Sequence, residues 1–348
     1  MSDKIKLFQT ERAWQEIREQ VWALTEEQHQ LGQAQNSNIT RDLETRLANK
    51  FNRKHCVTTA NCTDALTIAL IALGLPKRSM VGVSNYTFTA SAHAIARAGY
   101  TAIPIDITDN YCVDTTKVKY LSALVAVDLF GNMSNWAELN KLDIPIVNDA
   151  AQSLESHDGV NWSAGYGKLS CISFSPSKTI SSWGSGGAIL TDDDELVAIC
   201  KKLRLHGKSK NDDLAIHPGL NSMLGSFEAA CVIAGLDRMD LWLERRRKIA
   251  EYLITESQYP TGLDMTLQSN TLHKLVFQSQ DRESLRKKFI DAGIDCPIHY
   301  INMISDEPLY KNNCEFPVSD KLKNITFTVP NQHTLTDIEV ERIAKELK

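Results

Sequence analysis

The sequence predicts an α/β protein with a mostly parallel seven-stranded sheet flanked by helices, followed by a smaller C-terminal α+β domain. Between residues 55 and 205, short apolar runs bounded by breakers alternate with helical stretches, a pattern that indicates a parallel sheet covered by helices. Beyond Pro260 this alternation gives way to a mixture of short strand-like and helical segments. A length of 348 residues is sufficient for a full core and two domains. The pattern does not give the order of the strands.

The N-terminal part is expected to be helical. Residues 8–33 are polar and helix-prone, and Trp14, Ile17 and Val21 recur there at helical spacing. A second helix is expected over residues 40–52, because it follows Asn38 and carries acidic residues near its start.

The alternating region contains seven strand-like runs, at residues 55–59, 80–84, 101–105, 123–129, 144–148, 169–174 and 187–190. Helices are expected between most of them, at 63–73, 89–98, 135–141 and 194–205. A long helical stretch from 225 to about 257 precedes the segments 271–278, 281–293, 325–329 and 336–348. We therefore predict a large domain over residues 1–235, including the N-terminal helices, and a small domain over 236–348 with a long linking helix.

Composition and charge exclude several classes of protein. A net charge of −5 argues against a nucleic-acid-binding protein, and the basic run at 245–248 is expected to be a solvated helix face. The eight cysteines are scattered without a Cys-x-x-Cys pair, which favours reduced thiols over a disulfide framework or a zinc site. The first residues lack the apolar core of a signal peptide, and no run approaches the roughly 20 apolar residues that span a bilayer. We expect a cytoplasmic protein with no bound metal, nucleic-acid partner or membrane span.

Two polar residues stand where neighbouring strands are expected to end. Asp149 follows the run at 144–148, and Lys178 follows the run at 169–174. Open α/β folds bind ligands at such sheet edges. A lysine that forms a Schiff base, with an acidic partner for a pyridinium nitrogen, is what pyridoxal phosphate (PLP) chemistry requires. Taken singly, however, Asp149 could cap a helix and Lys178 could be a solvated loop lysine.

Two further strand-to-helix junctions could contribute to such a site. Thr63 is well placed as the N-cap of the helix at 63–73, and a helix N-terminus with free amides and a hydroxyl is a ready phosphate site. Phe88, at the second junction, could lie over a flat ring, although packing in the core is the commoner position of an aromatic side chain.

Several short motifs, taken together and in this order, resemble those of the DegT/StrS sugar aminotransferases, which are fold-type-I PLP enzymes. They lie at residues 61–66, 87–88, 127–131, 149–152, 173–178 and 219–221. The resemblance extends from about residue 40 to the end of the chain. It implies that Lys178 forms the Schiff base, that Asp149 contacts the pyridine nitrogen and that Gln152 lies near the ring hydroxyl. It also implies that Phe88 stacks on the ring and that Cys62, Thr63 and Ser173 bind the phosphate. The segment containing Asn221 resembles the one through which an asparagine of the partner subunit reaches the phosphate, which implies a homodimer with shared active sites.

The activity implied is the transfer of an amino group from L-glutamate to the C3 or C4 keto group of a nucleotide-linked keto-6-deoxy sugar, for amino-sugar and polysaccharide biosynthesis. His299 and Tyr300 are candidates for contacting the sugar, with core or surface packing as an equal alternative. Three positions depart from the family pattern, namely Cys62 in place of glycine, Asp128 in place of histidine and Ser185 in place of glutamate.

Two alternatives remain open at this point. One is a different fold-type-I activity, such as a lyase or a desulfurase that uses Cys314 as its reactive thiol. The other is a non-catalytic relative that binds a sugar nucleotide, although the retention of Asp149 and Lys178 weighs against it. A related dehydratase branch carries histidine in place of the lysine, and Lys178 argues against that branch.

Overall fold

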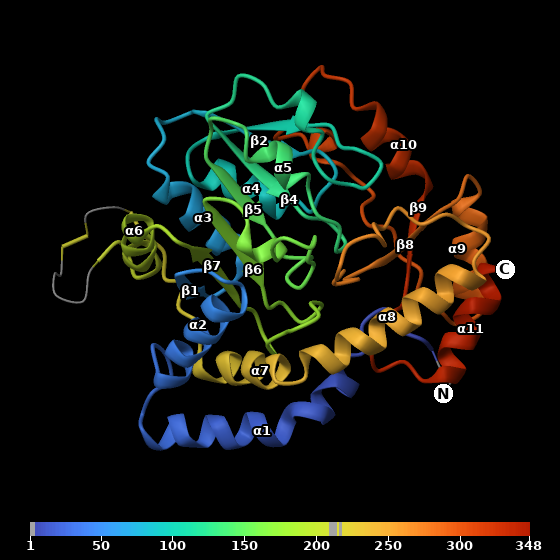
Figure 1. Ribbon diagram of the computed structural model, residues 1–348, viewed down its shortest axis with the longest axis horizontal. Coiled ribbons are helices and arrows are strands. Elements are labelled where there is room, and N and C mark those ends of the chain that lie inside the picture. Colours follow the sequence, from blue (N-terminus) through green and yellow to red (C-terminus); the bar gives the residue numbers. More distant parts are fainter. Residues whose placement is uncertain (1–3, 209–213, 216–217) are drawn as a thin grey trace.

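The computed structural model describes residues 4–208, 214–215 and 218–348 (Figure 1). Its main sheet has seven strands in the order β1-β7-β6-β5-β4-β2-β3. The strands are β1 (His55–Thr59), β2 (Met80–Ser84), β3 (Thr101–Ile105), β4 (Ala123–Val127), β5 (Ile146–Asp149), β6 (Leu169–Ser173) and β7 (Gly187–Thr191). Each predicted strand is therefore present within two residues of its expected ends.

The sheet is mostly parallel, as predicted. The neighbours β3, β2, β4, β5 and β6 pair in parallel, while β7 runs antiparallel to both β6 and β1. The central parallel strands β4, β5 and β6 are buried along their whole length, as expected when helices cover both faces of a sheet. The carboxyl ends of β4, β5 and β6 consequently lie side by side at one edge.

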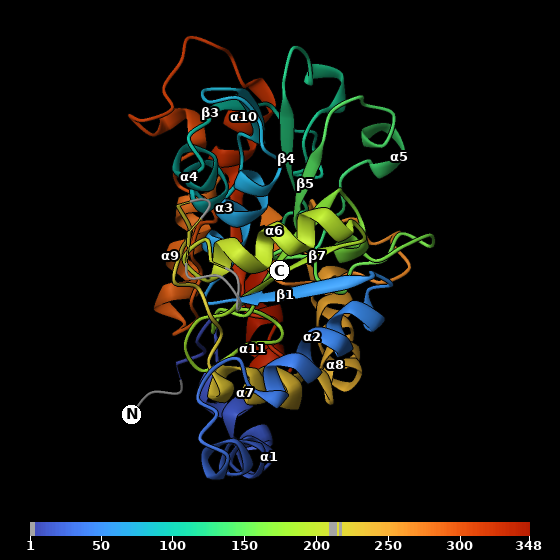
Figure 2. The same ribbon diagram turned by 90° about the vertical axis from the view of Figure 1, so that its left-hand side faces the viewer.

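Two groups of helices cover the two faces (Figures 1 and 2). One group packs with Val57 and Ile189 and comprises α3 (Cys62–Ala72), α4 (Ala90–Arg97) and α6 (Asp194–Arg204). The other packs with Cys56 and Ala188 and comprises α1 (Thr10–Gln30), α2 (Asn38–Lys50) and α7 (Ser226–Leu236). The short helix α5 (Trp136–Leu139) closes a third cluster against β4 and β5. Alternate residues of one strand thus enter opposite cores, which is the period-two pattern of a β-strand.

Contrary to expectation, the chain forms two helices and not a single long one after residue 225. Helix α7 ends at Leu236, and α8 (Met239–Glu256) begins after Asp237 and Arg238. The side chains of these two residues bind α1 and α2, since Asp237 accepts hydrogen bonds from Gln20 and Arg46, and Arg238 donates to Gln20. Such tertiary contacts at a helix junction leave no signal in helical periodicity.

The C-terminal segment forms a small antiparallel sheet of β8 (Leu275–Gln278) and β9 (Thr326–Val329), packed with α9 (Arg282–Asp291), α10 (Pro317–Ile325) and α11 (Asp337–Leu347). In Figure 1, α8 runs from the main sheet towards this part of the molecule and lies beside α11. The predicted boundary between residues 235 and 236 falls at the α7–α8 junction and stays a prediction.

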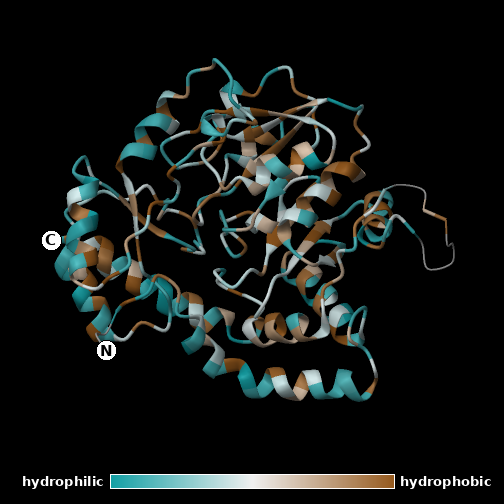
Figure 3. Cartoon of the chain, turned by 180° about the vertical axis from the view of Figure 1, so that it is seen from behind, coloured by the Kyte–Doolittle hydropathy of each residue, from teal (hydrophilic) through white to brown (hydrophobic). Residues whose placement is uncertain are grey.

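Hydrophobic residues gather in the central strands, while the outer helix surfaces carry many hydrophilic ones (Figure 3). None of the helices in the described part of the chain combines the length and the apolar character needed to cross a bilayer. All eight cysteines are free, and Cys314 is the exposed one.

Candidate active site

A cavity of about 370 Å³ opens at the carboxyl ends of the central strands. Its volume falls within the roughly 300–1,000 Å³ that is typical of small-molecule sites. Nine of the ten residues that the sequence predicts for the site line this cavity, namely Cys62, Thr63, Phe88, Asp149, Gln152, Ser173, Lys178, His299 and Tyr300. They come from the α3 N-terminus, the β2–α4 junction, the ends of β5 and β6 with the loop after β6, and the loop between α9 and α10.

Asn221 is the exception. It is exposed, pairs through its backbone with Leu205, and lies outside the residues that line the cavity of its own chain. Its predicted role in the site of a partner subunit stays a prediction. Cys314, the candidate thiol of a desulfurase, is exposed and also lies outside this cavity.

Asp149 ends β5, and its carboxylate is almost completely buried. Ser91 Oγ donates a hydrogen bond to its Oδ2 at 2.7 Å, and the Ala151 amide donates to Oδ1 at 3.2 Å. Burial raises the pKa of Asp149, although these hydrogen bonds and the nearby Lys178 oppose the shift. A cationic N–H group in the cavity would therefore stabilise the charged carboxylate.

Lys178 lies five residues beyond the end of β6, in a tight loop in which its amide bonds to the Ser175 carbonyl. Burial lowers the pKa of Lys178, while Cys62 and Asp149 act in the opposite direction. A lowered pKa increases the fraction of neutral amine at neutral pH, which is the form that acts as nucleophile or base.

The N-terminus of α3 faces the same cavity, but Thr63 is not its N-cap. The helix begins at Cys62, and the side chain of Asn61 caps it by accepting a hydrogen bond from the Asp64 amide at 2.8 Å. The extended backbone of Asn61 suits an N-cap, and asparagine is a preferred capping residue. Thr63 is consequently not used for capping and lines the cavity in the first turn of the helix, where free backbone amides are suited to an anion.

Glycine is required where β7 passes this turn. A Cβ atom at Gly187 would lie 2.7 Å from the Cys62 nitrogen and from the Asn61 carbonyl carbon. Only a residue without a side chain allows the strand to approach the helix N-terminus so closely.

The side chain of Gln152, just after β5, bonds to the loop between α9 and α10 that carries Tyr300. Its Nε2 donates to the Tyr300 hydroxyl at 2.8 Å, and its Oε1 accepts from the Phe130 amide at 3.3 Å. The Phe88 ring, 56% exposed, lies 6.0 Å from the Tyr300 ring, measured between centroids. An aromatic face is thus open towards the cavity.

Sequence reasoning missed Ser91, His273 and Lys274 at this site. His273 Nδ1 lies 3.1 Å from Gln152 Oε1, and Lys274 is only 5% exposed. The signal that could have indicated them is a histidine and a lysine placed directly before an apolar strand. The basic run at 245–248 also differs from expectation, because Arg246 is buried and donates hydrogen bonds to the carbonyls of Leu272 and His273 at 2.6 and 3.1 Å.

Asp128, which replaces the histidine of the family pattern, is fully buried and is not among the residues lining the cavity. Its carboxylate accepts hydrogen bonds from the Ser134 amide at 2.7 Å, Trp136 Nε1 at 3.2 Å and Ser163 Oγ at 2.7 Å. The carboxylate therefore ties the loop that follows β4 to the short 3-10 helix at Ser163–Gly165.

We expect Asp128→Ala to lower the free energy of unfolding by roughly 3 kcal/mol, because it leaves buried donors without an acceptor. KM for the acceptor substrate should remain unchanged in the folded variant. Chemical denaturation and steady-state kinetics measure the two effects. Asp109→Ala, at an exposed aspartate, is the control and should lose almost no stability. A stable Asp128 variant with a raised KM would instead indicate a role in substrate binding.

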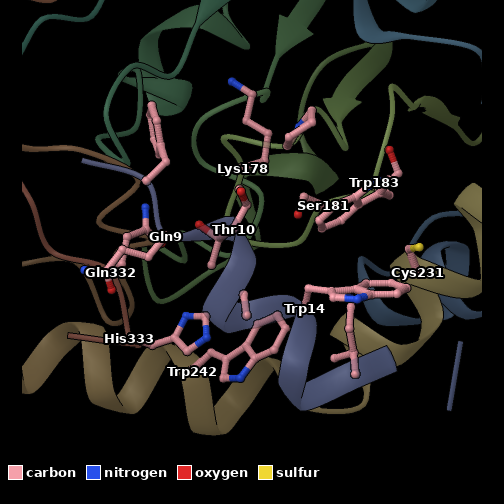
Figure 4. A pocket seen from close by; sticks show the side chains of 16 residues that line it. Gln9, Thr10, Trp14, Lys178, Ser181, Trp183, Cys231, Trp242, Gln332 and His333 are labelled. Carbon is pink, nitrogen blue, oxygen red and sulfur yellow. The ribbon is translucent and has the colours of Figure 1, made fainter. Parts of the chain in front are cut away.

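A second, smaller cavity of about 100 Å³ is also lined by Lys178 and by its neighbours Pro176 and Thr179 (Figure 4). Trp14, Trp242 and His333 line it, and in Figure 4 the Lys178 side chain extends away from them. Neither Asp149 nor Ser173 lines this cavity. The carboxylate and the amine therefore act together only in the larger one.

The residues around the larger cavity suit PLP. Asp149 is a buried carboxylate whose raised pKa calls for a cationic N–H partner, and a pyridinium nitrogen provides one. The first-turn amides of α3, with Thr63 and Ser173, provide donors for a phosphate, and Phe88 provides an aromatic face. With this cavity at the edge of this sheet, the chain is a PLP-dependent aminotransferase of fold type I.

More specifically, the chain belongs to the DegT/DnrJ/EryC1/StrS aminotransferase family, whose model matches residues 15–348. It is 28% identical over 320 residues to UDP-2-acetamido-2-deoxy-3-oxo-D-glucuronate aminotransferase of Pseudomonas aeruginosa, covering 88% of this chain and 89% of that protein. It is 30% identical over 271 residues to dTDP-3-amino-3,4,6-trideoxy-alpha-D-glucose transaminase of Streptomyces venezuelae, covering 74% and 71%. The crystal structure of DesV from Streptomyces venezuelae has the same fold, with a TM-score of 0.93, 24% identity and coverage of 99% and 98%.

Proposed function

We propose that this enzyme moves the amino group of L-glutamate to the keto group of a nucleotide-linked sugar. The observation that carries this proposal is the convergence of Lys178 and Asp149 on one cavity that also contains a helix N-terminus suited to phosphate. A transaminase needs all three features in a single space, because one cofactor must contact them together.

PLP supplies an electron sink for the negative charge that develops on the α-carbon of the amino donor. In our proposal Lys178 would attach the cofactor and, as a free amine, would take up and return the proton of the donor α-carbon. The lowered pKa of Lys178 supports this role, since a base is most effective when its pKa is near the working pH.

The other residues would hold and orient the cofactor. Asp149 would keep the ring nitrogen protonated, with Ser91 and the Ala151 amide fixing the carboxylate. Gln152 would bind the ring hydroxyl, and Phe88 would cover one ring face. Cys62, Thr63 and Ser173 would bind the phosphate. Asn221 would reach the phosphate held by the partner subunit of a homodimer, and its exposure within its own chain supports such a contact. We place this homodimer in the cytoplasm.

Position C3 is the site of amination that we propose for the acceptor. The relatives from Pseudomonas aeruginosa and Streptomyces venezuelae are named for a 3-oxo and a 3-amino sugar, respectively. One of these names denotes a uronate and the other a deoxy sugar. They therefore support C3 without fixing the substituent at C6.

We expect the enzyme to aminate 3-keto nucleotide sugars at least 10-fold faster than the 4-keto isomers, because a ketone in the wrong place is not positioned near the reacting atoms. The measurement uses L-glutamate with a panel of 3-keto and 4-keto dTDP-, UDP- and GDP-sugars, and detects the amino-sugar product. Faster turnover of the 4-keto series would contradict the C3 assignment. A PLP-loaded enzyme that aminates none of the sugars would contradict the proposed function, and would favour the non-catalytic sugar-nucleotide-binding alternative if the sugars still bound.

A further inference from the structure

The cavity contains a second buried amine besides Lys178. Lys274 stands immediately before β8, is 5% exposed and lines the same cavity as Lys178 and Asp149. Its ammonium lies 4.7 Å from the centroid of the Phe8 ring, which also lines the cavity. Burying an ammonium group is unfavourable unless a counter-charge accompanies it.

No acidic residue of the described chain supplies that counter-charge. Burial lowers the pKa of Lys274 well below its usual range, and the charged groups that contribute, Lys178 and Arg246, are cations that act in the same direction. Asp149 is the only acidic residue among the described residues that line the cavity, and it already accepts hydrogen bonds from Ser91 and Ala151. The Phe8 ring stabilises a cation but adds no negative charge.

The backbone that presents Lys274 is fixed. Arg246 donates hydrogen bonds to the carbonyls of Leu272 and His273, and Asn331 Nδ2 donates to the Leu272 carbonyl at 2.8 Å. A buried amine that faces a substrate cavity from a rigid backbone is better suited to bind an anion than a flexible surface lysine is.

The substrates of the proposed reaction bring the missing charge. L-Glutamate carries two carboxylates, one of them bonded to the carbon that reacts, and an acceptor sugar of the uronate type carries another. Among the described lining residues there is no arginine, and burial lowers the pKa values of His273 and His299, which disfavours the cationic form of both rings. Lys178 is assigned to the cofactor. Lys274 is therefore the basic side chain that remains for a substrate carboxylate, and a bound carboxylate would favour its charged form.

We propose that the Lys274 ammonium binds a substrate carboxylate, from either the amino donor or an acidic acceptor sugar. This inference rests on the proposed aminotransferase function and names the residue that recognises the acidic group. A bound carboxylate would pair with the ammonium in a water-poor site, where a charge-assisted hydrogen bond is strong. Lys274 is then a determinant of specificity for acidic substrates.

The test compares the PLP-loaded wild type with Lys274→Met, which keeps the length and apolar stem of the side chain and removes its charge. Calorimetry with glutarate, which has the two carboxylates of glutamate but no amine, measures carboxylate binding without turnover. Kinetics of the separate half-reactions then use L-glutamate, L-glutamine, and a pair of 3-keto nucleotide sugars with and without a C6 carboxylate. Lys274→Arg keeps the charge, and Lys141→Met, at an exposed lysine, is the matched control.

We expect Lys274→Met to weaken the binding of the ligand whose carboxylate Lys274 contacts. Its Kd or KM should rise about 10- to 100-fold, with kcat changed only a few-fold. Lys274→Arg should recover much of this loss, and Lys141→Met should show none. Weaker binding of glutarate, glutamate and glutamine alike identifies the donor α-carboxylate as the group that Lys274 binds. A loss for glutarate and glutamate alone identifies the donor side-chain carboxylate, and a loss for the uronate sugar alone identifies the acceptor.

Unchanged constants for every ligand would overturn the proposal. Equal losses for the two sugars, or a loss that follows a weakened affinity for PLP, would also overturn it, because either result indicates a structural role. The proposed function fails in a different way, when the wild type binds glutarate but does not transaminate.

Discussion

Lys178→Ala is expected to abolish transamination, with a loss of at least about 10³-fold in kcat. Proton transfer by a positioned side chain contributes roughly 10²- to 10⁴-fold, and the same lysine is proposed to attach the cofactor. The variant should still fold, because its side chain faces a cavity and not the core. Single-turnover absorbance measurements with L-glutamate follow the donor half-reaction directly.

The matched control is Lys168→Ala. Lys168 is a half-exposed lysine that pairs with Asp193 at 3.3 Å and lies outside the cavity, so its replacement should leave turnover unchanged. If Lys178→Ala retained transamination at a rate near that of the control, Lys178 would have neither of the two proposed roles.

Asp149→Asn is expected to lower kcat by about 10²- to 10³-fold, because removing one preorganised charged group from a shielded site costs roughly 3–4 kcal/mol of transition-state stabilisation. The amide has nearly the same shape but cannot hold a negative charge against the ring nitrogen. PLP should therefore still bind, and a titration that monitors absorbance, combined with stopped-flow kinetics, measures affinity and rate separately.

Ser91→Ala provides a graded comparison. It keeps the Asp149 charge and removes one hydrogen bond of 2.7 Å to its carboxylate, so we expect a loss of about 10-fold or less. Near-normal rates for Asp149→Asn would refute the role of the carboxylate in stabilising the developing charge. A larger loss for Ser91→Ala than for Asp149→Asn would point to positioning as the main contribution.

Much of the fold could be predicted because its signals are local. The runs at 80–84 and 169–174 are apolar and bounded by breakers, and they form β2 and β6 almost as expected. Strand order could not be predicted, since the position of β7 between β1 and β6 depends on contacts such as that between Gly187 and the α3 turn. The break between α7 and α8 could not be predicted from the sequence either, because it depends on side-chain contacts with α1 and α2.

The residues of the site likewise fall into two groups, those that the sequence pattern marks and those that it does not. Asp149 and Lys178 stand at strand ends, where the pattern of the sequence marks them, and both line the cavity. Ser91 and Lys274 belong to the same site, but the first looks like an ordinary helix residue and the second interrupts an apolar segment. Burial makes Lys274 chemically distinct, and this burial is set by the packing around β8, which no short stretch of sequence reveals.

The assignment of Lys178, and not Lys274, as the residue that attaches PLP is the centre of this account. Borohydride reduction of the yellow holoenzyme, followed by proteolysis and mass spectrometry, locates the attached cofactor. We predict a single pyridoxyl group on the peptide that contains Lys178. A label on Lys274, or no label on any lysine of a cofactor-loaded protein, would contradict the account.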